Sequence, residues 1–133
     1  TTVIGRKPTP EQKRLVEQCA GIVDELIDML KPGLPVRDLI ARGDEMTEEA
    51  GGTKDQAGEM WPLYGHGVGQ FWEQPWLGAE ILEGVETFEE NMVLGIEAFL
   101  AHEGVGSAGF EQNVILTSDG AELLTTTPML FWD

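Results

Sequence analysis

In the first quarter of the chain, apolar residues recur at the spacing of a helix. Between Leu15 and Leu30 they fall three and four positions apart, which places them in one stripe along a helix surface. Thr9 precedes the stripe as an N-cap residue, and Gln12 stands at the capping-box position. Lys31-Pro32-Gly33 ends the pattern. The sequence therefore predicts a helix whose apolar stripe faces the core.

A second helical pattern follows immediately. It opens at Pro35 and directs Val36, Leu39 and Ile40 inward. Gly51-Gly52 ends it. A glycine in its middle, at position 43, is expected to weaken this helix.

The pattern then changes to short apolar runs separated by turn residues, which is typical of strands. We expect strands, in chain order, at residues 60–64, 92–102, 110–117 and 121–126, with a tight hairpin turn at Ser118-Asp119-Gly120. Residues 77–90 are expected to form an acidic loop. The predicted fold class is α+β, with two helices followed by a curved, mainly antiparallel sheet, in a single domain over residues 1–133.

A glycine-rich stretch surrounds one of the two histidines. Gly65, Gly67 and Gly69 alternate with His66 and Val68, and we expect this stretch to form a loop. An imidazole held between glycines suits a metal ion or an acid–base role. A satisfied histidine in a glycine-rich turn explains the local residues equally well, so both interpretations stay open at this level.

Aromatic residues gather around the same stretch. They could enclose a methylated cation by cation–π attraction, or they could belong to the core or to a subunit interface. We take three of them as candidate substrate-binding residues, together with His102 at the end of the strand over 92–102. The candidate substrate-binding residues are Trp61, Tyr64, Trp72 and His102.

Two glutamates stand out in the predicted strands. Glu97 interrupts the apolar run Leu94 to Leu100, and Glu111 lies near the start of the next strand. A carboxylate in such a run is expensive to bury unless it is paired or bound to a metal. Adjacent antiparallel strands could place both carboxylates on one face, where His66 would join them. Nitrogen and oxygen donors suit Zn, Mn, Fe or Co. Alternatively, both glutamates face water at the sheet edges.

The charge distribution limits the kinds of partner that the chain is expected to bind. The formal net charge is −16, and every Lys and Arg lies at or before Lys54. The acidic remainder repels phosphate, which argues against nucleic acid and favours a metal cation, a cationic ligand or a basic partner chain.

No apolar run approaches the roughly 20 residues that cross a bilayer. Cys19 has no partner for an internal disulfide, so a cytoplasmic location is expected.

Four motifs in order resemble one family. They are Gly65-His66-Gly67-Val68-Gly69, then Glu73-Gln74-Pro75, then the run from Asn91 to Ala98, then the run from Phe110 to Thr125. Together they are similar to the C-terminal part of the catalytic domain in the pita-bread metallopeptidase superfamily, which includes methionine aminopeptidase, aminopeptidase P, prolidase and creatinase. The two predicted helices also resemble those that precede the histidine in that fold.

The resemblance implies a site with two divalent metal ions, Mn, Zn, Co or Fe. His66, Glu97 and Glu111 match three of the family's five metal ligands, and His66 and Glu97 are the implied catalytic residues. The family's two aspartate ligands have no match and would lie just upstream of Thr1. We therefore expect that an N-terminal part precedes this chain in the whole protein. By itself, the chain is expected to be inactive and able to exist without bound metal.

The activity implied is hydrolysis of a small peptide, of the Xaa-Pro aminopeptidase or prolidase kind, by a homodimer. One departure leaves a different activity open, because Trp72 stands where the peptidases carry a second histidine. The loop that follows His66 is also shorter than in the peptidases. In this it resembles the branch of the family containing dimethylsulfoniopropionate lyase, which acts on a small methylated cation. A metal-free binding role is the third reading of the chain.

Overall fold

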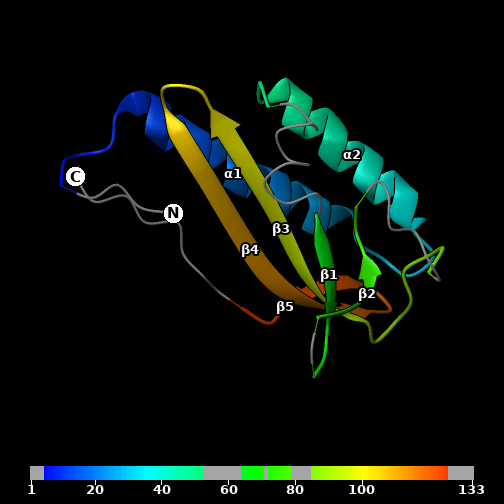
Figure 1. Ribbon diagram of the computed structural model, residues 1–133. Coiled ribbons are helices and arrows are strands. Elements are labelled where there is room, and N and C mark those ends of the chain that lie inside the picture. The colour runs from blue at the N-terminus through cyan, green and yellow to red at the C-terminus, as the bar shows by residue number, and fades with distance from the viewer. Residues whose placement is uncertain (1–4, 53–63, 71, 79–84, 126–133) are drawn as a thin grey trace.

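Two helices and one five-stranded antiparallel sheet make up the structure, which is a computed structural model (Figure 1). It describes residues 5–52, 64–70, 72–78 and 85–125. The strands are ordered β2-β1-β3-β4-β5 across the sheet, with every neighbouring pair antiparallel. The elements, in chain order, are α1 (Pro10–Met29), α2 (Val36–Glu49), β1 (Gly65–Val68), β2 (Trp72–Trp76), β3 (Val93–His102), β4 (Gly106–Thr117) and β5 (Gly120–Leu123). The predicted α+β class, with helices first and sheet second, is confirmed.

Helix α1 begins as its sequence predicts. The backbone N–H of Gln12 donates to Thr9 Oγ1 at 3.3 Å, and the backbone N–H of Thr9 donates to Gln12 Oε1 at 3.0 Å. This reciprocal pair satisfies donors that the first turn would otherwise leave open. The Gln12 side chain also donates to the Val105 carbonyl at 3.1 Å, which ties the helix start to the turn between β3 and β4.

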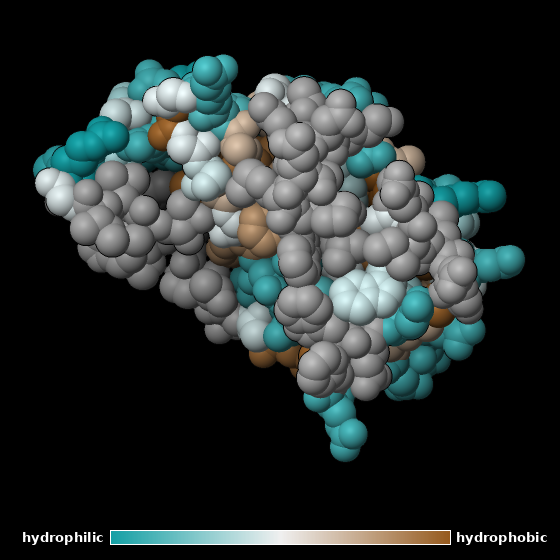
Figure 2. All heavy atoms as spheres, viewed as in Figure 1, coloured by the Kyte–Doolittle hydropathy of each residue, from teal (hydrophilic) through white to brown (hydrophobic). Residues whose placement is uncertain are grey.

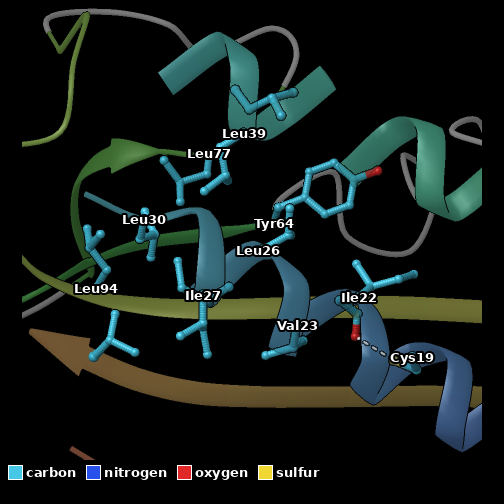
Figure 3. Close-up of a cluster of buried hydrophobic side chains, with 14 of the residues drawn as sticks. Cys19, Ile22, Val23, Leu26, Ile27, Leu30, Leu39, Tyr64, Leu77 and Leu94 are labelled. Atoms are coloured by element: carbon cyan, nitrogen blue, oxygen red, sulfur yellow. Dashed lines mark hydrogen bonds between the residues drawn. The ribbon is translucent and has the colours of Figure 1, made fainter. Parts of the chain in front are cut away.

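The core lies between α1 and the sheet (Figure 3). The apolar stripe of α1 packs on alternate residues of β3, and α2 closes one side of the cluster. The buried residues of α1 are Leu15, Cys19, Ala20, Ile22, Val23, Leu26 and Ile27, and their counterparts on β3 are Leu94, Ile96, Ala98 and Leu100.

Cys19 is part of this core. Its thiol is fully buried and donates to the Ala98 carbonyl at 3.1 Å. Burial raises the pKa of the Cys19 thiol to about 11, because the apolar surroundings disfavour the thiolate. Cys19 therefore serves the packing of α1 against the sheet.

Helix α2 holds Tyr64, the residue that leads into β1. A Cβ atom at Gly43 would lie 2.8 Å from carbons of the Tyr64 ring, so only glycine leaves room for the ring there. The Tyr64 hydroxyl donates to Asp44 Oδ1 at 2.9 Å and lies 3.1 Å from Thr47 Oγ1. Burial raises the pKa of Tyr64 well above its ordinary value. The glycine expected to weaken α2 is therefore the position where α2 receives the ring (Figure 3).

The strand prediction was wrong around the histidine. The stretch expected as a loop forms β1, which pairs with β3 on one side and with β2 on the other. Residues Trp72–Trp76, for which the sequence predicts no strand, form β2. Their glycines and proline obscure the strand pattern, whereas pairing on both sides satisfies the β1 backbone. Of the strand expected at 60–64, Tyr64 lies outside any strand and the rest falls outside the described residues.

The other strand boundaries differ by a few residues. β4 begins at Gly106 instead of Phe110, because pairing with β3 continues to the turn after His102. β5 ends at Leu123 instead of Thr126. The predicted hairpin turn at residues 118–120 is confirmed, since Thr117 pairs with Gly120 across it.

The surface seen in Figure 2 is mainly hydrophilic where the structure describes it, and hydrophobic residues show only as small separate areas. Arg42 of α2 joins the two helices, because its Nε donates to Glu25 of α1 at 2.6 Å. Its Nη1 also donates to Glu45 within α2 at 2.6 Å. Neither α1 nor α2 has the apolar length that crossing a membrane requires.

Replacing Gly43 with alanine is expected to lower the free energy of unfolding by about 1–3 kcal/mol. The new methyl group would displace the Tyr64 ring, and this cost outweighs the gain of up to about 1 kcal/mol that alanine normally brings to a helix. Thermal or urea unfolding measures the change.

Gly21 in α1 provides the matched control. A Cβ atom there has nothing within 4 Å, and Gly21 is exposed. Gly21→Ala should therefore stabilise the protein by about 0.5–1 kcal/mol. Equal stabilisation by both substitutions would contradict the tight packing of Tyr64 on α2.

Candidate metal centre

The two faces of the sheet have different chemistry. Along β3 and β4, alternate side chains point toward the helices and form the core, and the residues between them point the other way. The face turned away from the helices carries, at its centre, a group of residues that we call the polar face. Its members are His66, Gly95, Glu97, Glu111 and Asn113.

One row across the sheet joins three strands of the polar face. His66 of β1 pairs with Gly95 of β3, and Gly95 pairs with Asn113 of β4. Gly95 has no side chain, so the side chains on either side meet above it. A Cβ atom at Gly95 would lie 2.9 Å from Glu111 Oε1, 3.3 Å from Asn113 Oδ1 and 3.4 Å from His66 Cε1. Gly95 is the floor of a small polar niche.

The neighbouring row places two carboxylates opposite each other. Glu97 of β3 pairs directly with Glu111 of β4. Glu97 is 5% exposed, whereas Glu111 is exposed. Like charges directly opposite on an antiparallel pair repel each other, and burial of one of them strengthens the repulsion. A cation bound between them would relieve it.

His66 is held with a defined orientation next to these carboxylates. Its Nδ1 lies 2.9 Å from the Gly67 carbonyl oxygen, which can only accept a hydrogen bond, so Nδ1 carries the proton. The lone pair of a neutral ring is then on Nε2, which lies 3.9 Å from Glu97 Oε1. The ring is 7% exposed and tilts against Trp76, with ring centroids 6.0 Å apart. A histidine that donates one ring N–H to a backbone carbonyl is typical of metal ligands.

Gly65 explains how the chain delivers His66 to this face. Tyr64 and His66 are two residues apart, and in a regular strand they would share a face. Instead Tyr64 packs beneath α2, and His66 lies on the polar face. Gly65 has φ of +150°, which side chains rarely adopt, and its Cβ position would collide with the Gly95 carbonyl oxygen. Glycine at 65 therefore permits both the change of face and the close approach of β1 to β3.

The structure brings together three of the residues singled out in the sequence, and it separates the others from them. His66, Glu97 and Glu111 share the polar face. Tyr64 lies in the core beneath α2, on the other face. Trp61 and the side chain of Trp72 lie outside the described part of the chain.

His102 also lies on the helix side of the sheet. It is two residues after the core residue Leu100 in β3, so both side chains point to the same face of the sheet. The side chain of Glu97 points to the opposite face. Its Nε2 lies 3.7 Å from the Cβ position of Gly51, just after α2, and has no hydrogen-bond partner among the described residues. The structure therefore does not place His102 with the two carboxylates.

Gly95 and Asn113 were missed as site residues. Both follow from strand alternation, since Gly95 is two residues before Glu97 and Asn113 is two residues after Glu111. The signal was present in the sequence, but neither residue type attracts attention in a strand.

The donor set of the polar face fits a divalent cation. It offers an oriented imidazole, two facing carboxylates and an amide oxygen over a niche that a Cβ atom would fill. Among residues 5–52, 64–70, 72–78 and 85–125, no group of three or more His, Cys, Asp or Glu side chains lies close enough to hold a metal ion by itself.

These features define an α+β domain with a helix-covered face and a carboxylate-bearing face. The model of metallopeptidase family M24 matches residues 1–118. The chain therefore belongs to metallopeptidase family M24. The predicted pita-bread resemblance is confirmed, and members of this family typically bind divalent metals.

Solved structures with this fold include several peptidases. Prolidase from Pyrococcus furiosus is 26% identical with a TM-score of 0.78, and the match covers 96% of this chain and 36% of that one. X-Pro aminopeptidase from Thermotoga maritima is 25% identical with a TM-score of 0.74, over 92% and 33% of the two chains.

Methionine aminopeptidase from Rickettsia prowazekii shares the fold at 19% identity, with a TM-score of 0.63 over 86% of this chain and 52% of that one. The chain thus spans about a third of the length of the prolidase and X-Pro aminopeptidase that it matches. None of the curated protein sequences compared with it matches.

The glycines at 65 and 95 are expected to respond differently to alanine. Gly65→Ala should cost about 3 kcal/mol of unfolding free energy or more, because it combines a rare φ with a collision against backbone. Gly95→Ala should cost under about 1 kcal/mol, since the nearest atom is the end of the exposed Glu111 side chain, which can move. Urea unfolding of both variants measures the difference. A loss at Gly95 as large as that at Gly65 would show that its niche is rigidly filled.

Proposed function

We propose that the natural protein containing this chain is a metal-dependent peptidase that hydrolyses small Xaa-Pro peptides. The observation that carries the proposal is the pairing of Glu97 with Glu111 beside an oriented His66, in a chain of family M24. Xaa-Pro specificity rests on the likeness to a prolidase and to an X-Pro aminopeptidase, at 26% and 25% identity.

In this proposal His66, Glu97 and Glu111 hold two divalent metal ions, together with ligands from outside this chain. Bound metal ions would lower the pKa of a water molecule and polarise the peptide carbonyl. Glu97 is buried and keeps its oxygens away from bulk water, which suits cation binding. Glu111 is exposed, so its carboxylate can be reached by a substrate, which suits proton transfer to the leaving amine. His66 keeps its Nε2 lone pair directed into the site through its Nδ1 hydrogen bond to Gly67.

A second candidate function is an elimination or hydrolysis on a small methylated cation. Trp76 favours it, because this ring lies beside His66 on the edge of the polar face and its π-face attracts cations. A homodimer, a cytoplasmic location and the two upstream aspartates stay predictions of the sequence.

Metal binding is expected to raise the melting temperature of the natural protein, because a ligand that binds only the folded state stabilises it. Manganese(II) at about 100 times its dissociation constant should add about 2.7 kcal/mol. His66→Ala should abolish this shift. The matched control is His102→Ala, which removes the other histidine from the opposite face and should keep the shift. Loss of the shift in both variants, or its absence from the wild type, would contradict the proposed site.

Glu97→Gln is expected to lower kcat for an Xaa-Pro dipeptide by about 100-fold or more, because the amide neither binds a metal as a carboxylate does nor carries its charge. Glu103→Gln, in the exposed turn after β3, is the control and should leave kcat unchanged. The wild type is assayed on an Xaa-Pro dipeptide, on a dipeptide without proline and on dimethylsulfoniopropionate. Turnover of the sulfonium compound alone would replace the peptidase by the second candidate.

A further inference from the structure

Asn113 has a buried amide oxygen that the fold does not use. Its Oδ1 is buried and has no hydrogen-bond partner among the described residues. A buried acceptor left unsatisfied destabilises the fold, so such a group needs an explanation. Both backbone polar groups of this residue are satisfied. Its backbone N–H donates to Thr125 Oγ1 at 2.9 Å, and its carbonyl accepts from the backbone N–H of Leu124 at 2.8 Å.

The folding of β4 does not require an amide at this position. The backbone of Asn113 is held by Leu124 and Thr125, and its side chain neither closes a turn nor caps a helix. An apolar residue of similar shape would fill the same space without leaving an unsatisfied oxygen. The amide therefore points to a ligand rather than to packing.

The surroundings of Oδ1 define what that ligand is. Asn113 faces His66 across Gly95, and a Cβ atom at Gly95 would touch both Asn113 Oδ1, at 3.3 Å, and Glu111 Oε1, at 2.9 Å. Two oxygens that share a niche, one of them from a carboxylate, attract a cation. Carboxylate and amide oxygens are ligands that manganese and other hard divalent cations prefer.

We propose that Asn113 is a further binding residue of the metal centre. Its amide oxygen binds the divalent cation that His66 and Glu111 hold. The inference rests on the proposed metal-dependent function and deepens it. It adds a neutral oxygen donor from β4 to the imidazole and carboxylates, and it makes Gly95 the residue that keeps the space between these donors open.

The test compares manganese(II) affinity with the stability of the metal-free protein, both measured on the natural protein that contains this chain. Asn113→Leu should weaken manganese affinity by about 10- to 100-fold in titration calorimetry. It should leave the melting temperature of the metal-free protein unchanged or raise it, since an unsatisfied buried oxygen is removed. Asn113→Asp restores an oxygen with added charge and should bind manganese at least as tightly as the wild type.

Ser107→Ala is the matched control, because Ser107 lies on the same face of β4, exposed and three alternate positions from Asn113. It should leave manganese affinity unchanged. Two results would overturn the inference while leaving the metal centre intact: unchanged affinity in Asn113→Leu, whatever its metal-free melting temperature, or Asn113→Asp binding as weakly as Asn113→Leu. A wild type that binds no manganese would instead overturn the proposed function, and this inference with it.

Discussion

The registered pairing of β3 with β4 is the constraint on which the rest of the structure depends. Their residues pair without interruption from Val93 with Ile115 to His102 with Gly106. Because side chains alternate across a sheet, this one register decides both faces at once. It sends Leu94 and Ile96 into the core beneath α1 and sends Gly95 and Glu97 the other way. A slip of one residue would expose the core and bury the carboxylates against the helices, so the hydrophobic effect that drives α1 onto the sheet also holds the polar face in place.

Sequence reasoning succeeded where a local physical signal and the tertiary structure agree. The capping box at Thr9 and Gln12, the apolar stripe of α1 and the turn at residues 118–120 are each determined by neighbours in the chain. Glu97 and Glu111 could be expected on one face because alternation and antiparallel pairing are general properties of strands. Residues 65–76 could not be assigned as strands, because β1 and β2 exist through pairing with partners distant in sequence, and their glycines and Pro75 argue locally against a strand.

The departures from good local design concentrate on the polar face. A nearly buried glutamate, a second glutamate opposite it, an unsatisfied amide oxygen and a glycine at φ +150° all lie within three consecutive rows of the sheet. On the helix side of the sheet the described core is mainly apolar, and its exceptions are separate from one another: the unpartnered Nε2 of His102 and the buried polar residues Thr47 and Gln112. Natural proteins break packing rules mainly where function requires it, so this concentration is itself physical support for a functional site. The acidic composition of the chain adds to the same attraction for cations.

The position of Tyr64 gives α2 an influence over a site that it does not touch. The ring and hydroxyl of Tyr64 are held by α2, while its backbone N–H donates to Leu77 and its carbonyl accepts from the N–H of Glu97. Helix α2, β1 and the carboxylate strand are thus joined through a single residue that directly precedes Gly65 and His66. A substitution in α2 that displaces the Tyr64 ring would therefore also shift the backbone that leads into His66, so the packing of this helix contributes to the position of the imidazole.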